Sequence, residues 1–385
     1  MTMETKQEIF REKLALYLKA DKAGKGDILD AVCEVTGGHR KAAIRRFRTL
    51  QMRDTVAHRE HRGRKMVYGK SVTGALRELW EMMSRICAER MHDEIPAYVG
   101  ILTRDKMWRH DETTTASLLA MSVGTMKARI ALFPNVKKRG GRGTTKPSDL
   151  KEIIPVRRGP WQNPAPGYGE IDTVAHCGGS LFGDYCYTVQ YTDVATIWTC
   201  LAGQWQKGEE ATVQSVERIA AHLPFPLLGI DPDSGGEFIN WHLEGWCRKR
   251  NIQMTRTRPY MKNDHARIEQ KNYANVRRVV GYSRFDDVRQ VGILNELYDV
   301  LEDYLNFFIP SVKCVRKERL VSGARTVRIY DGAKTAYQRV LEHPDIAEDI
   351  KEKLREKYAT LNPKKLKDEC DRLVRKLLAF RPKLR

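Results

Sequence analysis

The order of β-rich and helical segments after residue 169 restricts the fold of this chain more than any other feature. Five short β-rich or apolar runs occur there, at residues 170–176, 185–193, 197–202, 226–230 and 253–255. Amphipathic helical patterns over residues 209–222 and 237–251 separate the last three runs. Three successive strands followed by alternating helices and strands predict an α/β fold with a mixed five-stranded sheet and flanking helices.

Two helix-turn-helix patterns precede this region. In the first, a helix ends at Gly37-Gly38 and a second helix covers residues 39–50. The second pattern spans residues 113–132, where Ser122 is a candidate N-cap. A recognition helix presents basic side chains to a DNA groove, and the candidates here are Arg40, Lys41, Arg45 and Arg48 in the first pattern and Lys127 and Arg129 in the second. An ordinary helical hairpin with a solvated basic face has the same pattern.

Charge is unevenly distributed along the chain. Residues 1–150 carry a net charge of +12, residues 151–310 a net charge of −3 and residues 311–385 a net charge of +10, which gives +19 in total. Basic segments on both sides of a mildly acidic centre indicate a polyanionic partner, for which we expect double-stranded DNA. A basic protein that binds no nucleic acid could carry the same charge.

The patterns predict five regions: helix-turn-helix residues 1–70, a second helical region over 71–135, a basic Gly/Pro linker over 136–168, the α/β core over 169–310, and a basic C-terminal region over 311–385 with a small β element followed by helices. No apolar run approaches the roughly 18–20 residues that span a bilayer. The N-terminus lacks the apolar core of a signal peptide. We therefore expect a cytoplasmic, nucleoid-associated protein with no membrane partner.

Three acidic residues occupy positions where a carboxylate needs a partner. Asp172 lies inside the first β-rich run, Asp233 follows the fourth, and Glu269 lies about one turn into a helical pattern over residues 264–280. A carboxylate in a buried sheet is costly unless it is paired or binds a cation. If the first and fourth strands are neighbours, the carboxylates converge, and two divalent ions would relieve their repulsion. Asp231 is the alternative to Asp233 at the same strand end, and otherwise braces the turn.

This arrangement resembles the DDE catalytic core of bacterial insertion-sequence transposases and retroviral integrases. The resemblance rests on the strand with Asp172, on the sequence DSGGEF over residues 233–238, and on the thirty-five residues between Asp233 and Glu269. Two further stretches are similar to integrase-type insertion-sequence transposases, namely residues 255–264 followed by residues 269–272, and the region from residue 316 onward with residues 330–335.

The resemblance implies an RNase H-like fold, two Mg²⁺ or Mn²⁺ ions held by Asp172, Asp233 and Glu269, and strand cleavage followed by 3′-hydroxyl strand transfer at the ends of a mobile element. Pairing two such ends requires a homo-oligomer on DNA, at least a dimer. Basic residues around the site are candidates to hold phosphates: Arg256, Arg258, Lys262, His265, Arg267 and Lys271. The same residues could instead form a solvated basic rim, with His265 as a local hydrogen-bonding residue.

Two other functions stay open on these residues alone. One is a catalytically silent DNA-binding regulator derived from a transposase, and the other is an RNase H-like nuclease without joining activity. A metal-dependent nicking assay distinguishes the regulator, and a strand-transfer assay with pre-cut ends distinguishes the nuclease.

Overall fold

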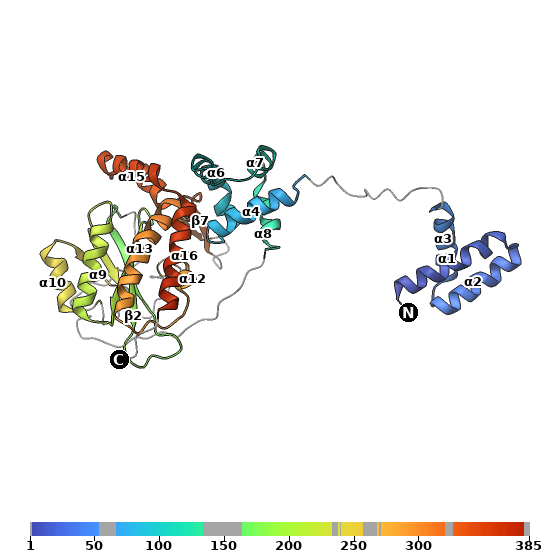
Figure 1. Cartoon of the computed structure of the whole chain (residues 1–385), viewed down its shortest axis with the longest axis horizontal. Coiled ribbons are helices and arrows are strands. Elements are labelled where there is room, and N and C mark those ends of the chain that lie inside the picture. The colour runs from blue at the N-terminus through green and yellow to red at the C-terminus, as the bar shows by residue number, and fades with distance from the viewer. Residues whose placement is uncertain are drawn as a thin grey trace. The chain divides into compact units, whose positions relative to one another are not determined.

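The computed structural model describes residues 2–53, 67–133, 164–232, 238, 240–256, 268, 271–319 and 326–380. The chain divides into two compact units, Met1–Val67 and Tyr68–Arg385, which run from blue to red along the chain in Figure 1. Most of the predicted linker over 136–168 lies outside the described residues. Within the described part of the chain, no helix is both long enough and apolar enough to cross a bilayer.

The first unit contains three helices, α1 (Met3–Lys19), α2 (Lys22–Thr36) and α3 (Arg40–Arg53). Gly37 ends α2 in the left-handed conformation, with φ of 64°, which confirms the predicted break between the two helices. The core of the unit is small and centred on Phe47, which is fully buried, stacks on Tyr17 and meets the ring of Phe10 edge-on.

The second unit begins with short helices that pack on its C-terminal half. They are α4 (Lys70–Met82), α5 (Ala88–Met91), the 3-10 turn η1 (His92–Glu94), α6 (Ile95–Arg104), α7 (Glu112–Leu119) and α8 (Val123–Ile130). Ser122 caps α8 by accepting a hydrogen bond from the Thr125 N–H at 3.4 Å, as predicted. Tyr98 donates from its hydroxyl to the carbonyl of Phe308 at 3.0 Å. These helices share one hydrophobic core with the sheet region.

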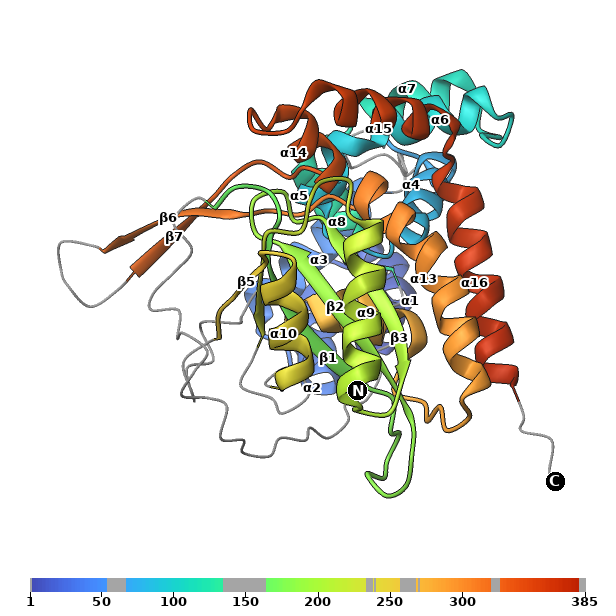
Figure 2. The same ribbon diagram turned by 90° about the vertical axis from the view of Figure 1, so that its left-hand side faces the viewer.

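A five-stranded mixed sheet forms the centre of the second unit, which confirms the predicted α/β class. Its strands are β1 (Tyr168–Ala175), β2 (Cys186–Asp193), β3 (Thr199–Trp205), β4 (Gly229–Pro232) and β5 (Gln253–Met254), in the order β3-β2-β1-β4-β5. Only β2 runs opposite to the others. Figure 2 shows α9 (Glu209–His222) and α10 (Trp241–Lys249) over one face of this sheet.

The helix α13 (Arg289–Phe308) covers the outer edge of β3. Asn306 donates to the carbonyl of Thr199 and accepts from its N–H, both at 2.8 Å, and Asn295 accepts from the Gly203 N–H at 2.8 Å. Between them, Glu302 accepts from the N–H of Leu201 at 2.6 Å. These side chains satisfy backbone groups that an edge strand otherwise leaves open.

The chain ends with a two-stranded ribbon and three helices. The ribbon is β6 (Cys314–Arg319) paired with β7 (Thr326–Tyr330), followed by α14 (Ala336–Glu342), α15 (Glu348–Thr360) and α16 (Pro363–Ala379). The buried residues Cys370, Leu373 and Leu377 belong to the face of α16 that packs against α13. The C-terminal helices are therefore part of the core of this unit.

Candidate active site

Asp172 lies in the central strand β1, where it is half-buried. Its Oδ1 accepts a hydrogen bond from the backbone N–H of Thr173 at 2.7 Å. On the neighbouring strand β2, Gln190 pairs with Asp172 in register and is fully buried. Neither polar atom of the Gln190 amide has a hydrogen-bond partner among the described residues. Asp172 therefore lies opposite a buried amide whose hydrogen-bonding capacity is unused.

The parallel neighbour β4 carries a second carboxylate toward the same end of the sheet. Pro232, the last residue of β4, pairs with Ile171. Asp231 is fully buried, and its Oδ1 accepts a hydrogen bond from the Thr255 hydroxyl at 2.5 Å. This contact agrees with the bracing role considered for Asp231. The first and fourth strands are neighbours, as the convergence of the acids requires.

A third segment reaches Asp172 from the π-helical turn η4 (Asn272–Arg277). Asn272 donates from Nδ2 to Oδ2 of Asp172 at 2.6 Å. Its other amide atom, Oδ1, is buried and has no hydrogen-bond partner among the residues that the structure describes. π-Helical turns are rare and frequently occur at functional sites. Sequence reasoning assigned no role to Asn272, and the only signal for it was its place in the stretch 269–272 that resembles integrase-type transposases.

Several predicted site residues lie outside the described part of the chain: Asp233, Arg258, Lys262, His265, Arg267 and Glu269. The arrangement of the three predicted carboxylates therefore stays a prediction. Among the described residues, no group of three or more His, Cys, Asp and Glu side chains is placed to hold a metal ion. The described site consists of Asp172 with Asn272 and Gln190 beside it, and of the end of β4.

Burial controls the titration of two basic groups in this region. His176 is fully buried with its Nε2 2.7 Å from the Thr188 hydroxyl, and burial lowers its pKa to about 3. It is neutral at pH 7 and acts as a structural residue. Lys271 is half-buried, and desolvation followed by the charges of Arg90 and Arg339 lowers its pKa to about 7. Burial among these cations therefore weakens the hold of Lys271 on its proton.

The predicted DNA-contacting residues of α3 are all exposed. They are Arg40, Lys41, Arg45 and Arg48. Arg40 is engaged within the unit by an ion pair with Asp30, and Arg45 donates to the carbonyl of Lys41 at 3.3 Å. The helix thus presents a basic surface, and its contact with DNA stays a prediction.

The other predicted DNA-binding residues differ in exposure and in their contacts. On α8, Lys127 is exposed and pairs with Glu89 at 2.6 Å. Arg129 is half-buried, donates to the carbonyl of Tyr68 at 2.9 Å and lies over the ring of that tyrosine. Arg256 is half-buried just beyond β5. Arg129 is therefore already engaged with residues at the start of the second unit.

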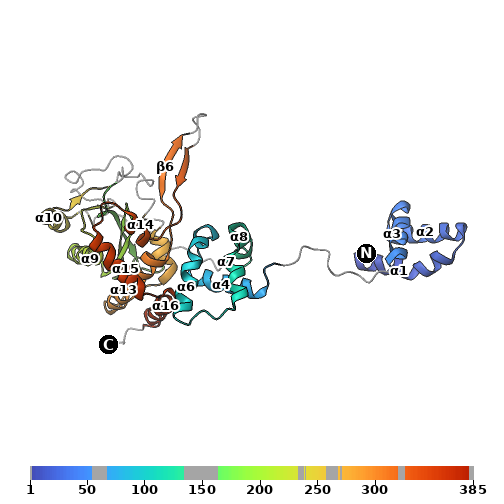
Figure 3. The ribbon, with the colours of Figure 1, turned by 90° about the horizontal axis from the view of Figure 1, so that it is seen from above.

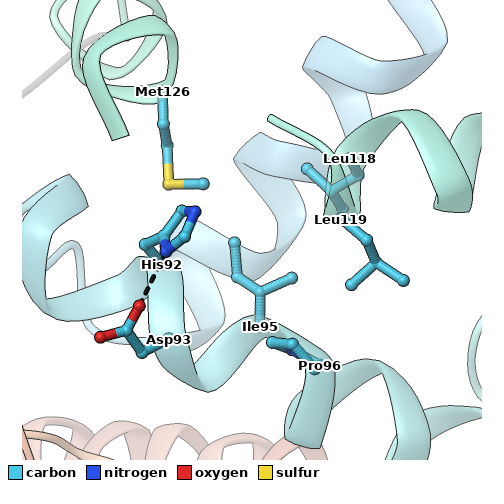
Figure 4. Close-up of a pocket in the computed structure, with 7 residues that line it drawn as sticks. All are labelled: His92, Asp93, Ile95, Pro96, Leu118, Leu119 and Met126. Carbon is cyan, nitrogen blue, oxygen red and sulfur yellow. Dashed lines mark hydrogen bonds and ion pairs between the residues drawn. The ribbon is translucent and has the colours of Figure 1, made fainter. Parts of the chain in front are cut away.

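A pocket of about 270 Å³ opens among η1, α6, α7 and α8. Figure 4 shows that its lining is mostly apolar, with one polar pair, His92 and Asp93, joined by a hydrogen bond of 2.8 Å. None of the predicted site residues lines it. The pocket is therefore separate from the candidate active site.

Comparison with known proteins identifies a relative that covers most of the chain. No protein-family model matches the chain. The uncharacterized protein y4rM of Sinorhizobium fredii (strain NBRC 101917 / NGR234) is 37% identical over 333 residues, which cover 86% of this chain and 93% of that protein. The chain belongs to the family of y4rM. The second unit accounts for 318 residues, so the similarity to y4rM includes part of the first unit as well.

Proposed function

We propose that this protein is a DDE-type DNA transposase whose second unit is an RNase H-like catalytic core. It binds the ends of a mobile element, cleaves a strand with water, and transfers the freed 3′-hydroxyl to target DNA. The sheet supports the proposal, because a three-stranded antiparallel meander followed by two strands parallel to β1 is the mixed arrangement expected for such a core.

The hydrogen bond between Asn272 and Asp172 is the observation that carries the proposal. It holds the helical segment that follows Glu269 against the strand that contains Asp172. On the other side of β1, the residue before Asp233 is paired with the residue before Asp172. Both segments that lead to the predicted carboxylates are therefore anchored beside the same residue, although they are distant in the sequence.

The described atoms fit a divalent cation. The Asp172 carboxylate and the buried Oδ1 of Asn272, which lacks a partner among the described residues, are hard oxygen donors of the kind that Mg²⁺ and Mn²⁺ prefer. Asp172, Asp233 and Glu269 would hold the ions. When bound, two ions activate the attacking oxygen and stabilise the leaving oxygen of a phosphodiester.

In this proposal the remaining residues orient the carboxylate of Asp172 or bind DNA. Asn272 fixes the rotamer of Asp172 through its amide N–H. Lys271 and Arg256 hold phosphates of the bound strand, and the basic surface of α3 binds the element's ends. Two ends are paired by at least two copies of the chain.

The Asp172→Asn variant tests this function. The probe is pre-cut duplex DNA that carries the inverted repeats flanking the gene, with Mg²⁺ present. We expect strand transfer to be abolished, because a neutral amide holds a divalent cation far less tightly than a carboxylate does, while binding of the same duplex changes less than about twofold. Asp184→Asn is the matched control, since Asp184 is exposed in the loop between β1 and β2.

Full joining activity in the Asp172→Asn variant would refute the assignment. Metal-dependent nicking by the wild-type chain without joining would instead support the RNase H-like nuclease. Specific binding without any nicking would support the silent regulator.

A further inference from the structure

Three amide side chains lie beside Asp172 or on the π-helical turn that contacts it. Each has at least one buried polar atom without a hydrogen-bond partner in the part of the chain that the structure describes. Gln190 on β2 lacks partners for both Oε1 and Nε2, Asn272 lacks one for Oδ1, and Asn275 lacks one for Nδ2. Gln190 is fully buried, and Asn275 is 4% exposed. A buried polar atom without a partner destabilises a fold, so such groups in a native core need an explanation.

The sheet places Gln190 directly between Asp172 and Leu201. Gln190 pairs in register with Asp172 on β1 and with Leu201 on β3. Residues directly opposite each other in antiparallel strands lie on the same face, with their Cβ atoms about 4.5–5.5 Å apart. Leu201 has no polar side-chain atom, so Asp172 is the polar neighbour of Gln190 across the sheet. At that separation, one water molecule is enough to join the Gln190 amide to the Asp172 carboxylate.

The neighbouring polar side chains on this face of β2 are already engaged. The Thr188 hydroxyl lies 2.7 Å from Nε2 of His176. The Thr192 hydroxyl lies 3.5 Å from the hydroxyl of Thr199. Gln190 lies between these two threonines along the strand, and strand side chains two residues apart share a face. The unused hydrogen-bonding capacity of β2 on this face is therefore concentrated at the position opposite the predicted metal ligand.

The chemistry of the amide favours a water molecule shared with Asp172. An amide has N–H donors and a carbonyl acceptor, so Nε2 of Gln190 can donate to a water that in turn donates to the carboxylate. A buried water needs about two to four polar partners, and the amide atoms of Asn272 and Asn275 come from the turn that contacts β1. Groups that hydrogen-bond to a metal ligand orient it and raise the affinity of the site for the ion.

We propose that Gln190 is a positioning residue for the divalent cation at Asp172, and that it acts through an ordered water shared by its amide and the Asp172 carboxylate. This inference rests on the proposed function, because it takes Asp172 as a metal ligand. Asn272 holds the carboxylate from η4 with a hydrogen bond of 2.6 Å, and Gln190 orients it from β2. The protein keeps an amide that destabilises the metal-free fold because the same amide tightens binding of the ion.

Binding of Mn²⁺ and thermal stability in the Gln190→Met variant test this inference together. Methionine is similar in length to glutamine and has no amide. Mn²⁺ alone is titrated into the full-length chain without DNA, and the unbound ion is measured by electron paramagnetic resonance. We expect the dissociation constant for Mn²⁺ to rise about 10–100-fold, the usual cost of losing a partner of a metal ligand. The Tm of the metal-free variant should rise by about 2–4 °C, because the unsatisfied amide is gone.

Gln204→Met is the matched control. Gln204 is also a buried glutamine of the sheet, but its Oε1 accepts from the Ser215 hydroxyl at 2.9 Å and its Nε2 donates to the carbonyl of Gln206 at 2.8 Å. It lies on the opposite face, against α9, which runs beside α10 in Figures 2 and 3. This variant should bind Mn²⁺ within about twofold of the wild type and lose thermal stability, since it leaves the partners of Gln204 unsatisfied.

The outcomes separate this inference from the proposed function. Unchanged Mn²⁺ affinity in Gln190→Met, together with weaker binding in Asp172→Asn, would overturn the role of Gln190 while leaving the proposed function intact. Absence of Mn²⁺ binding by the wild type, or equal affinity in Asp172→Asn, would overturn both. Weaker binding accompanied by a lower Tm in Gln190→Met would show that the amide supports the fold, and the positioning role would be wrong.

Discussion

His176 is a buried base that the fold keeps neutral. Its pKa is about 3 in the folded chain, below its ordinary value of 6.5, because burial disfavours the imidazolium. Between those two values the unfolded chain binds more protons than the folded one, so this residue contributes full stability above pH 6.5 and loses that contribution as the pH falls toward 3.

In the His176→Gln variant, the free energy of unfolding should therefore lose the part of its pH dependence that His176 contributes in this window. The free energy of unfolding of the wild type should fall more steeply between pH 6 and pH 4 than that of the variant, by up to about 1.4 kcal/mol per pH unit. Urea unfolding at each pH measures both slopes. His242→Gln, at a 66% exposed side chain, should retain the wild-type slope. Equal slopes in His176→Gln and the wild type would contradict the prediction.

Asp172 and Asn272 show how far a site can be predicted from sequence. An acidic residue within a β-rich run is an anomaly that the sequence itself displays, and this anomaly pointed to Asp172. Asn272 has no such signal, since an asparagine in a helical pattern is ordinary. Its role comes from a hydrogen bond to Asp172, which lies one hundred residues earlier in the sequence. The two side chains meet only because the π-helical turn packs against β1.

Side chains of α13 satisfy the outward-facing backbone groups of β3, which is the edge strand of the sheet. Asn306→Ala would leave both backbone groups of Thr199 buried without their partner. A buried group left unsatisfied costs about 1–3 kcal/mol, so we expect the free energy of unfolding to fall by about 2–4 kcal/mol in urea titrations. Glu296→Ala removes only an exposed ion pair with Lys376 and should cost under about 1 kcal/mol. A similar loss for both variants would show that the amide of Asn306 has no special role.

Elements with a continuous apolar stripe were predicted closely, and α13 was not. The predicted range 209–222 agrees with α9 to the residue. In α13 the buried positions include Glu302 and Asn306, which hydrogen-bond to the edge of β3. A buried polar residue that hydrogen-bonds to a distant strand is the same residue type in the sequence as one exposed to solvent. The sequence pattern therefore does not distinguish the two.

The division of the whole chain into two units leads to a prediction about unfolding. All seven tryptophans lie in residues 68–385, so their fluorescence reports on the second unit alone, whereas far-ultraviolet circular dichroism reports on both. Residues 68–385 expressed alone should keep the fluorescence midpoint of the full chain within about 2 °C. The full chain should show an additional dichroism transition from the first unit, whose core is small. One coincident transition that shifts on truncation would contradict this independence.

The helix α13, which covers the outer edge of β3, is synthesised late. Trp205 ends β3, and α13 is complete only at Phe308, about 100 residues later. At typical translation rates of about 5–20 residues per second, roughly 5–20 s separate the two events. During that interval the nascent chain on the ribosome exposes a strand whose open amides are a template for aggregation. We therefore expect the yield of folded protein in a cell to depend on how well the growing chain is protected until the asparagines of α13 emerge.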